Sequence, residues 1–226
     1  MKALGVIRYI CGGTAPKQPT AVTTRFSSDT IIVSWSAPQD DGGLKITAYK
    51  VVLRSSDQTQ FYEELSHCAG NQFGIVELRE CAIPAALLAA SPFNLPWGSE
   101  VVAKVSALNI KGESSQSEPG GGGILVASPK KPTNLAEVSS SRSSTTLGLK
   151  WDDGSDTGGL PIEKYRITLV AGTSQTQYQS TQRQMVLTGL DPGTTYTITV
   201  EASNSNGYSA PSDSISLLCA YKPFPP

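Results

Sequence analysis

The chain has 226 residues, of which 38% are hydrophobic and 16% are charged, and its net charge at pH 7 is -1. This length allows one large domain or two of roughly a hundred residues each. The near-zero charge offers no electrostatic surface for nucleic acid, and no apolar run is long enough for membrane insertion. The 21 glycines and 15 prolines favour an all-β protein with short strands and many turns.

Residues 1–10 combine β-branched, aromatic and other apolar side chains, and they predict a short β-prone arm. Lys2 followed by apolar residues is similar to the start of a secretory signal peptide. However, Arg8 interrupts the apolar run, and no small-residue cleavage site follows it. We therefore assign residues 1–15 to an N-terminal arm.

Two parts of the chain share one pattern, and this internal repeat is the strongest feature of the sequence. Trp35 and Tyr49 are separated by the same interval as Trp151 and Tyr165, and a Gly-Gly turn lies within each interval. Around them, apolar and polar residues alternate with the period of half-buried strands. The chain is therefore a tandem duplication of one domain plan.

Each copy contains a series of short segments of strand type, which indicates a sandwich of two antiparallel sheets. In the first copy the predicted strands cover 20–26, 30–36, 46–54, 60–65, 100–108 and 122–127. In the second copy they cover 133–138, 145–151, 162–170, 176–180, 184–187, 194–203 and 213–218.

Tyr196 follows a Pro-Gly turn and begins an alternating strand, the position of a tyrosine corner, whose hydroxyl bonds to upstream backbone. Its surroundings, Leu-x-Pro-x-Thr-x-Tyr over residues 190–196, and the repeated Trp and Tyr positions resemble a fibronectin type III domain. The resemblance covers about residues 16–220. It implies two Ig-like, fibronectin type III β-sandwiches, and because the segment between them is short we expect them to lie end to end. We expect the following aromatic residues to lie in the two cores: Trp35, Tyr49, Trp151, Tyr165 and Tyr196.

These patterns give a first domain at 16–128, a second at 129–220 and a Pro-rich tail at 221–226. The Pro-Lys-Lys-Pro segment at 129–132 is the expected joint between the domains. We interpret Gly120–Gly123 as a hairpin or bulge before the last strand of the first domain.

The first domain departs from the second in two respects. Val101 stands where the second copy has Tyr196, so the tyrosine-corner bond is absent there. The first copy also carries 21 extra residues between its Trp strand and its next-to-last strand (63 against 42). We place this insertion at about 66–95. Within it, the Ala- and Leu-rich run after Pro84 favours a helical turn.

The four cysteines are an even number, which is consistent with disulfides and an extracellular or cell-surface location. Cys68 and Cys81 are close in sequence and predict a local disulfide in the insertion, which contributes roughly 3 kcal/mol by loop closure. Cys11 and Cys219 lie at opposite poles of an end-to-end tandem, beyond bonding distance. They are candidates for a disulfide between two molecules.

No pattern in the chain predicts an enzyme, a metal site or a cofactor. His67 is the only histidine, and no nucleophile or second metal ligand accompanies it. The acidic loops at 40–41 and 152–156 lack the ligand spacing of a calcium loop and favour turns. The Ser- and Thr-rich run at 139–146 is open to two interpretations, O-linked glycans or a polar turn.

Three functional hypotheses stay open. In the first, the protein is a fibre subunit that assembles head to tail, because an apolar arm adds to a strand edge of the next copy. In the second, it is an adhesion or spacer module from a larger surface or matrix protein, with the insertion as ligand surface. An accessory carbohydrate-binding module is a third reading, and Trp97 is its candidate aromatic. The predicted assembly residues of the arm are Leu4, Val6, Ile7, Tyr9 and Ile10.

Overall fold

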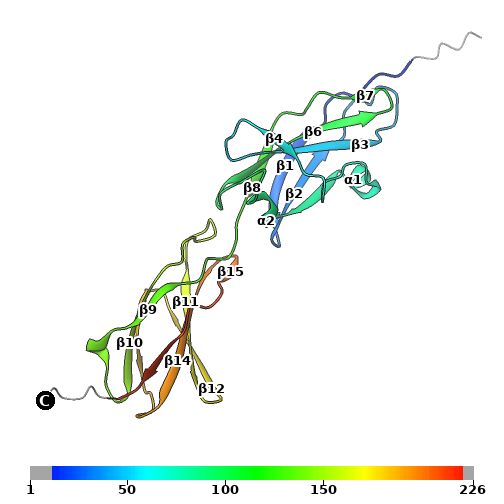
Figure 1. The fold of residues 1–226 in the computed structure, drawn as a ribbon. Coiled ribbons are helices and arrows are strands. Elements are labelled where there is room, and N and C mark those ends of the chain that lie inside the picture. The colour runs from blue at the N-terminus through cyan, green and yellow to red at the C-terminus, as the bar shows by residue number, and fades with distance from the viewer. Residues whose placement is uncertain (1–11, 221–226) are drawn as a thin grey trace, which may run out of the picture. The chain divides into compact units, whose positions relative to one another are not determined.

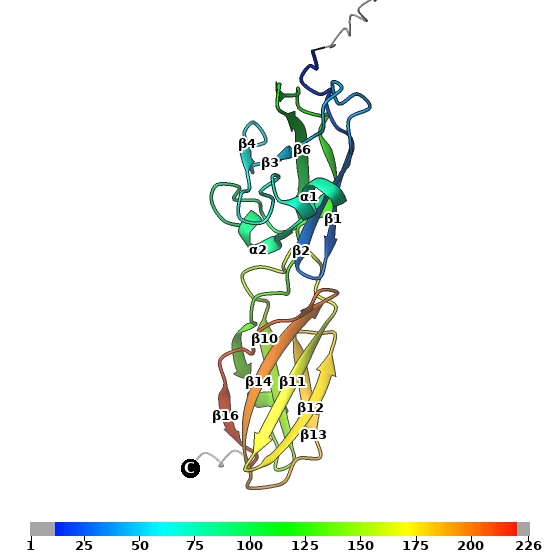
Figure 2. The ribbon, with the colours of Figure 1, turned by 90° about the vertical axis from the view of Figure 1, so that its right-hand side faces the viewer.

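A computed structural model describes residues 12–220 (Figures 1 and 2). The chain divides into two compact units between Leu125 and Val126, slightly before the predicted boundary at 128. We call them domain 1 and domain 2. Each is a sandwich of two antiparallel sheets, which confirms the predicted all-β fold class. The predicted assembly residues, Cys11 and the Pro-rich tail at 221–226 lie outside the described residues.

Domain 1 has one sheet of three strands in the order β1-β2-β5. Its second sheet has the order β4-β3-β6-β7, and β8 also pairs with β6. The bounds of these strands are β1 Thr20–Ser27, β2 Thr30–Ser36, β3 Ala48–Arg54, β4 Phe61–Glu63, β5 Glu80–Pro84, β6 Glu100–Asn109, β7 Gly112–Glu113 and β8 Gly120–Ile124. Two short helices, α1 (Phe73–Leu78) and α2 (Ala85–Leu88), flank β5 in sequence.

Domain 2 repeats this arrangement without the helices of domain 1. One sheet has the order β13-β10-β9, and the other has the order β12-β11-β14-β15 with β16 paired to β14. The bounds are β9 Thr133–Glu137, β10 Thr146–Asp152, β11 Lys164–Ala171, β12 Ser174–Ser180, β13 Gln184–Thr188, β14 Thr195–Asn204, β15 Gly207–Tyr208 and β16 Ile215–Leu218. A single 3-10 turn, η1 (Ser139–Ser141), follows β9.

The two cores are built around the predicted aromatic pairs. Trp35 and Tyr49 are buried in domain 1, and their rings meet edge to face with centroids 5.2 Å apart. Trp151 and Tyr165 repeat the contact in domain 2 at 5.4 Å. Alternating side chains of the central strands fill the space around each pair, because successive residues of a strand point to opposite faces.

The duplication extends to single hydrogen bonds. The side-chain amide of Asn109 donates to the carbonyl oxygens of Thr14 and Asp41, each at 2.8 Å. Asn204 makes the same pair of bonds in domain 2, to Ala127 and Thr157, also at 2.8 Å each. Both asparagines end the long central strand, so each one ties that strand to the beginning of its own domain.

The glycine run of domain 1 lies inside the last strand and not before it. β8 begins at Gly120, and its register with β6 shifts between Val101 and Ala103, so the glycines form both the strand and its irregularity. A Cβ atom on Gly120 would lie 1.9 Å from the carbonyl oxygen of Val22 in β1. The backbones of β1 and β8 therefore approach more closely than side chains would allow.

The predicted insertion holds more regular structure than its sequence suggests. The helical turn after Pro84 is confirmed as α2, but the residues before it form β5, which pairs with β2. Helix α1 also lies in this part of the chain and is in contact with β3 and β5. The insertion thus supplies the third strand of one sheet. The residues additional to the shared plan lie on both sides of β5: residues 64–79 before it, and α2 with the connection to β6 after it.

Candidate functional site

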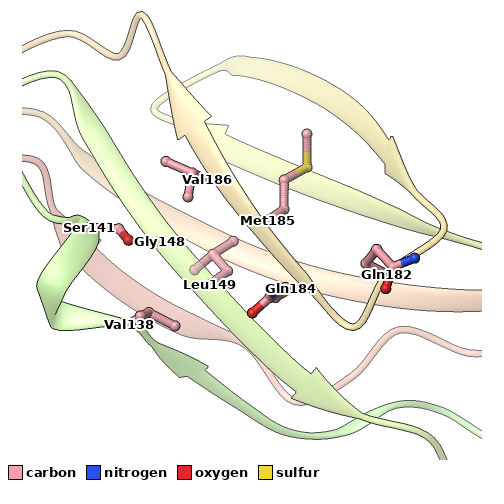
Figure 3. A pocket seen from close by; sticks show the side chains of 8 residues that line it. All are labelled: Val138, Ser141, Gly148, Leu149, Gln182, Gln184, Met185 and Val186. Atoms are coloured by element: carbon pink, nitrogen blue, oxygen red, sulfur yellow. The ribbon is translucent and has the colours of Figure 1, made fainter.

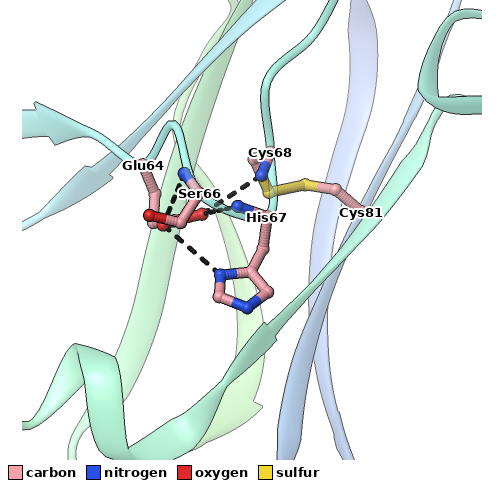
Figure 4. Close-up of a disulfide and its surroundings, with 5 residues drawn as sticks. All are labelled: Glu64, Ser66, His67, Cys68 and Cys81. Carbon is pink, nitrogen blue, oxygen red and sulfur yellow. Dashed lines mark hydrogen bonds and ion pairs between the residues drawn. A yellow bond between two sulfur atoms is a disulfide. The ribbon is translucent and has the colours of Figure 1, made fainter. Parts of the chain in front are cut away.

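The segment between β4 and β5 differs most between the two domains, and we call residues 64–79 the inserted segment. Cys68 forms a disulfide with Cys81 of β5, as predicted (Figure 4). Both cysteines are buried. Because Cys81 lies opposite Val33 of β2 in the sheet, the disulfide fastens the inserted segment to the three-stranded sheet.

Glu64 organises the start of the inserted segment, although nothing in the sequence singles it out. Its carboxylate accepts the backbone N–H groups of Ser66 at 2.9 Å, His67 at 2.8 Å and Cys68 at 3.1 Å (Figure 4). The His67 Nδ1 atom lies 3.5 Å from the same carboxylate. Burial on its own would raise the pKa of Glu64, but these donors outweigh burial and lower that pKa below its ordinary value. His67 is therefore part of the turn that the Glu64 carboxylate holds in place.

The inserted segment also covers an edge of domain 1. The carbonyl oxygen of Gly70 accepts the N–H of Tyr49 in β3 at 3.1 Å, beyond the point where the short strand β4 ends. A Cβ atom at position 70 would lie 1.6 Å from the Tyr49 carbonyl oxygen, so this approach requires glycine. The inserted segment thus replaces a longer edge strand.

Large apolar side chains of the inserted segment face solvent. Phe73 is 78% exposed and Leu78 is 75% exposed at the two ends of α1, and Leu65 is 62% exposed at the segment's start. Ile75, between the first two, is buried and packs against the core. The partly buried Val76 also packs against the core, so α1 is held by two apolar side chains while it presents two others outward.

Two open grooves adjoin the inserted segment. One, of about 540 Å³, is lined by Val76, Glu77 and Arg79 together with the β2–β3 connection. The other, of about 460 Å³, is lined by Leu65, Asn71 and parts of β3 and β6. Exposed apolar residues on an ordered, covalently fastened scaffold, flanked by grooves, are a typical surface for protein recognition.

A further hollow lies on domain 2, on the outer face of its three-stranded sheet (Figure 3). Gly148 of β10 has no side chain to fill the bottom of the hollow. Its sides are formed by Val138, Ser141 and Val186. The volume is about 400 Å³. Its lining contains amide and aliphatic groups but no ionisable side chain, so the hollow offers shape without acid–base chemistry.

Cys219, the predicted partner in a bond between molecules, points into domain 2. Its side chain is fully buried, and its thiol lies 3.2 Å from the carbonyl oxygen of Ser144. Burial raises the pKa of this thiol, which makes the reactive thiolate scarcer. A disulfide through Cys219 would require the end of the chain after β16 to open.

The acidic loops, the Ser- and Thr-rich run and Trp97 all take part in turns or in packing. Asp40, Asp41 and Asp156 each accept a backbone N–H two residues on, at 2.9, 2.8 and 2.7 Å, which confirms the predicted turns. The hydroxyl groups of Ser143 and Thr146 hydrogen-bond to each other within a polar turn, and O-linked glycans there stay a prediction. Trp97 packs against the core of domain 1.

Tyr196 forms the predicted corner, because its hydroxyl oxygen accepts the N–H of Asp191 at 3.0 Å. Among residues 12–220, no group of three or more His, Cys, Asp or Glu side chains is placed to hold a metal ion. Within the same range, neither helix has the length and hydrophobicity needed to cross a membrane.

Comparison with known proteins identifies similar sequences. The family model of the fibronectin type III domain matches residues 130–217. Mouse fibronectin type-III domain-containing protein 3A is 25% identical over 92% of this chain and 16% of its own length. Rat ephrin type-A receptor 6 is 26% identical over 86% of the chain and 19% of its own length. Human pikachurin is 34% identical over 41% of the chain and 9% of its own length. The chain thus spans less than a fifth of these relatives.

Solved structures are similar over 92% of the chain. The FN1–FN3 domains of chicken CNTN1 share 19% identity over 68% of their length, with a TM-score of 0.40. Domains A168–A170 of titin share 15% identity over 62% of their length, with a TM-score of 0.46.

Proposed function

Since the chain is a tandem of fibronectin type III domains, we propose that it is a non-catalytic recognition module of an extracellular or cell-surface protein. One of its relatives is named as a receptor. The Cys68–Cys81 disulfide supports an oxidising compartment, because such bonds seldom persist in the cytosol. The partner in this proposal is a neighbouring surface or matrix protein.

The exposed apolar side chains of the inserted segment carry this proposal. Domain 2 has the same scaffold without this segment. In domain 1 the segment covers the edge of β3, but it leaves several large apolar side chains outside the core. Exposed side chains such as Phe73 and Leu78 do not stabilise the core. Their apolar surface would be removed from water when a partner binds, and this burial would favour binding. An aromatic residue on a rigid support also loses little conformational entropy when it binds.

The proposal predicts that polar substitutions in the inserted segment reduce binding without unfolding the protein. Replacing both residues in a Phe73→Ser/Leu78→Ser variant removes the apolar contact while leaving the buried Ile75 in place. Labelled protein is applied to intact cells of the source species, and bound protein is measured over a range of concentrations. We expect affinity to fall about tenfold or more, as for loss of an interface anchor.

The matched control is Ile110→Ser. Ile110 is also 78% exposed in domain 1 but lies in the turn between β6 and β7, outside the inserted segment. Its substitution should leave cell binding unchanged. Equal binding by the double variant and the wild-type protein would contradict the proposed site.

Head-to-tail assembly into a fibre is the alternative proposal. It rests on the arm before residue 12 and on a disulfide through Cys219, whose buried position favours the recognition module instead. A carbohydrate-binding role would require exposed aromatic platforms, whereas Trp35 and Trp151 are core residues. The inserted segment is thus the better-supported site.

A further inference from the structure

The edge strand of domain 2, β12, has an open side. β12 pairs with β11 over its full length, from Ser174 opposite Ala171 to Ser180 opposite Tyr165. It ends the order of its sheet, and within residues 12–220 no strand pairs with its other side. Alternate backbone N–H and C=O groups of seven consecutive residues therefore point away from the sheet.

β12 lacks the features by which edge strands usually avoid pairing with other chains. Its seven residues include no charged residue and no proline, and its register with β11 is unbroken. In domain 1 the corresponding edge is different: β4 has three residues, and Gly70 covers the adjoining part of β3. One domain thus closes this edge and the other leaves it accessible.

The sequence of β12 identifies the partner that fits its open side. Ser-Gln-Thr-Gln-Tyr-Gln-Ser reads almost the same in both directions about Gln177. In an antiparallel pair of two such strands centred on Gln177, each Ser174 lies opposite Ser180 of the other copy, and Gln175 lies opposite Gln179. Thr176 lies opposite Tyr178, which is a favourable pair of a β-branched and an aromatic residue, and no like charges meet.

The side chains favour the same pairing. Gln175, Gln177 and Gln179 share one face of β12 and are exposed, and a primary amide both donates and accepts hydrogen bonds. When two copies pair across a two-fold axis, each of these amides lies opposite a glutamine amide of the other copy and can hydrogen-bond to it. On the other face Tyr178 packs against the core of domain 2, which keeps the strand ordered before it meets a partner.

We propose that β12 is a homotypic docking edge, through which two copies of this chain pair antiparallel and join their five-stranded sheets. The contact uses the same surface on both molecules, so it closes at a dimer. A strand-to-strand contact buries less area than a standard stable interface, and the dimer is accordingly weak. Concentration of the chain on a surface would favour it. The inserted segment of domain 1 takes no part, so this proposal and the proposed function can fail separately.

The test uses the complete chain and three matched charge variants. One variant carries Gln175→Lys, Gln177→Lys and Gln179→Lys, and a second carries Glu at the same three positions. In a homodimer each variant places like charges directly opposite one another, whereas a mixture of the two places opposite charges together. The control is Gln60→Lys, on the exposed connection before β4 in domain 1.

Sedimentation velocity gives the mass of each sample at rising concentration, and circular dichroism checks that each variant is folded. We expect a monomer–dimer equilibrium for the wild type and for Gln60→Lys. The Lys and Glu variants alone should dimerise at least about tenfold more weakly, and their mixture should recover the dimer. Hydrogen exchange in β12 should slow as the wild-type dimer forms.

Three results would overturn the proposal. The first is a wild-type chain that stays monomeric up to about 1 mM, the concentration scale of the weakest specific contacts. The second is a dimer that the Lys and Glu variants retain at full strength. The third is a mass that grows beyond the dimer, which would favour head-to-tail assembly instead.

Discussion

A single carboxylate, Glu64, holds the beginning of the inserted segment through three backbone N–H donors. Among residues 12–220, no backbone N–H group donates to the side chain of the neighbouring Glu63, which is exposed. Both residues look alike in the sequence, because the difference lies in their positions in the fold: Glu63 ends β4 and is exposed, whereas Glu64 begins the inserted segment and is buried. Patterns with a local partner were easier to interpret. The position of Tyr196 after a Pro-Gly turn predicted a bond from upstream backbone to its hydroxyl, and the structure identifies the donor as the N–H of Asp191.

Glu64 predicts a pH dependence at the residue scale. Its folded-state pKa is lowered, so ionised Glu64 stabilises the fold above its unfolded-state pKa, near 4.5, and this contribution is lost as pH falls through the folded value. The variant Glu64→Gln should lower domain 1 stability at neutral pH by about 2 kcal/mol, the scale of hydrogen bonds to a charged group. Denaturant unfolding measured at several pH values should then show a smaller loss on acidification than in the wild type.

Glu63→Gln is the matched control, because it changes the same group on the solvent face of β4. It should unfold like the wild type at each pH. A Glu64→Gln variant with unchanged stability at neutral pH would show that the three hydrogen bonds contribute little.

At the scale of elements, β8 depends on glycine for its position. A Gly120→Ala substitution should destabilise domain 1 by about 1–3 kcal/mol, because the added methyl group would overlap the Val22 carbonyl oxygen. Calorimetry of the full chain should show a lower melting temperature for domain 1 alone. The control Gly74→Ala adds a methyl group in open space on α1, and it should leave the melting temperature unchanged or slightly raised. Equal effects at both positions would contradict the close approach of β1 and β8.

The strands of the shared plan could be predicted because their alternation and turns are local properties of the sequence. β5 could not, since the residues around Cys81 become a strand only by pairing with β2, a long-range contact. Helix α1 was also missed. Its six residues have no capping side chain and no acidic first turn, and one buried residue, Ile75, anchors it. The site therefore depends on packing that no short sequence window contains.

At the scale of the whole molecule, duplication produced two sandwiches with the same core and the same asparagine ties. The largest difference between them lies at one edge, where domain 1 has the inserted segment and domain 2 has the open strand β12. The scaffold that the two domains share stabilises both of them. Residues that recognise a partner are therefore expected where the domains differ. We therefore expect the inserted segment to contact the partner.

Site-specific photo-crosslinking on intact cells tests this claim most directly. A photoreactive phenylalanine analogue replaces Phe73 in the complete chain, and a second protein carries it at Ile110, which is equally exposed. If the inserted segment contacts the partner, we expect a discrete crosslinked product from position 73 and none from position 110. Equal crosslinking from both positions, or none from position 73 while the protein remains bound to cells, would contradict it.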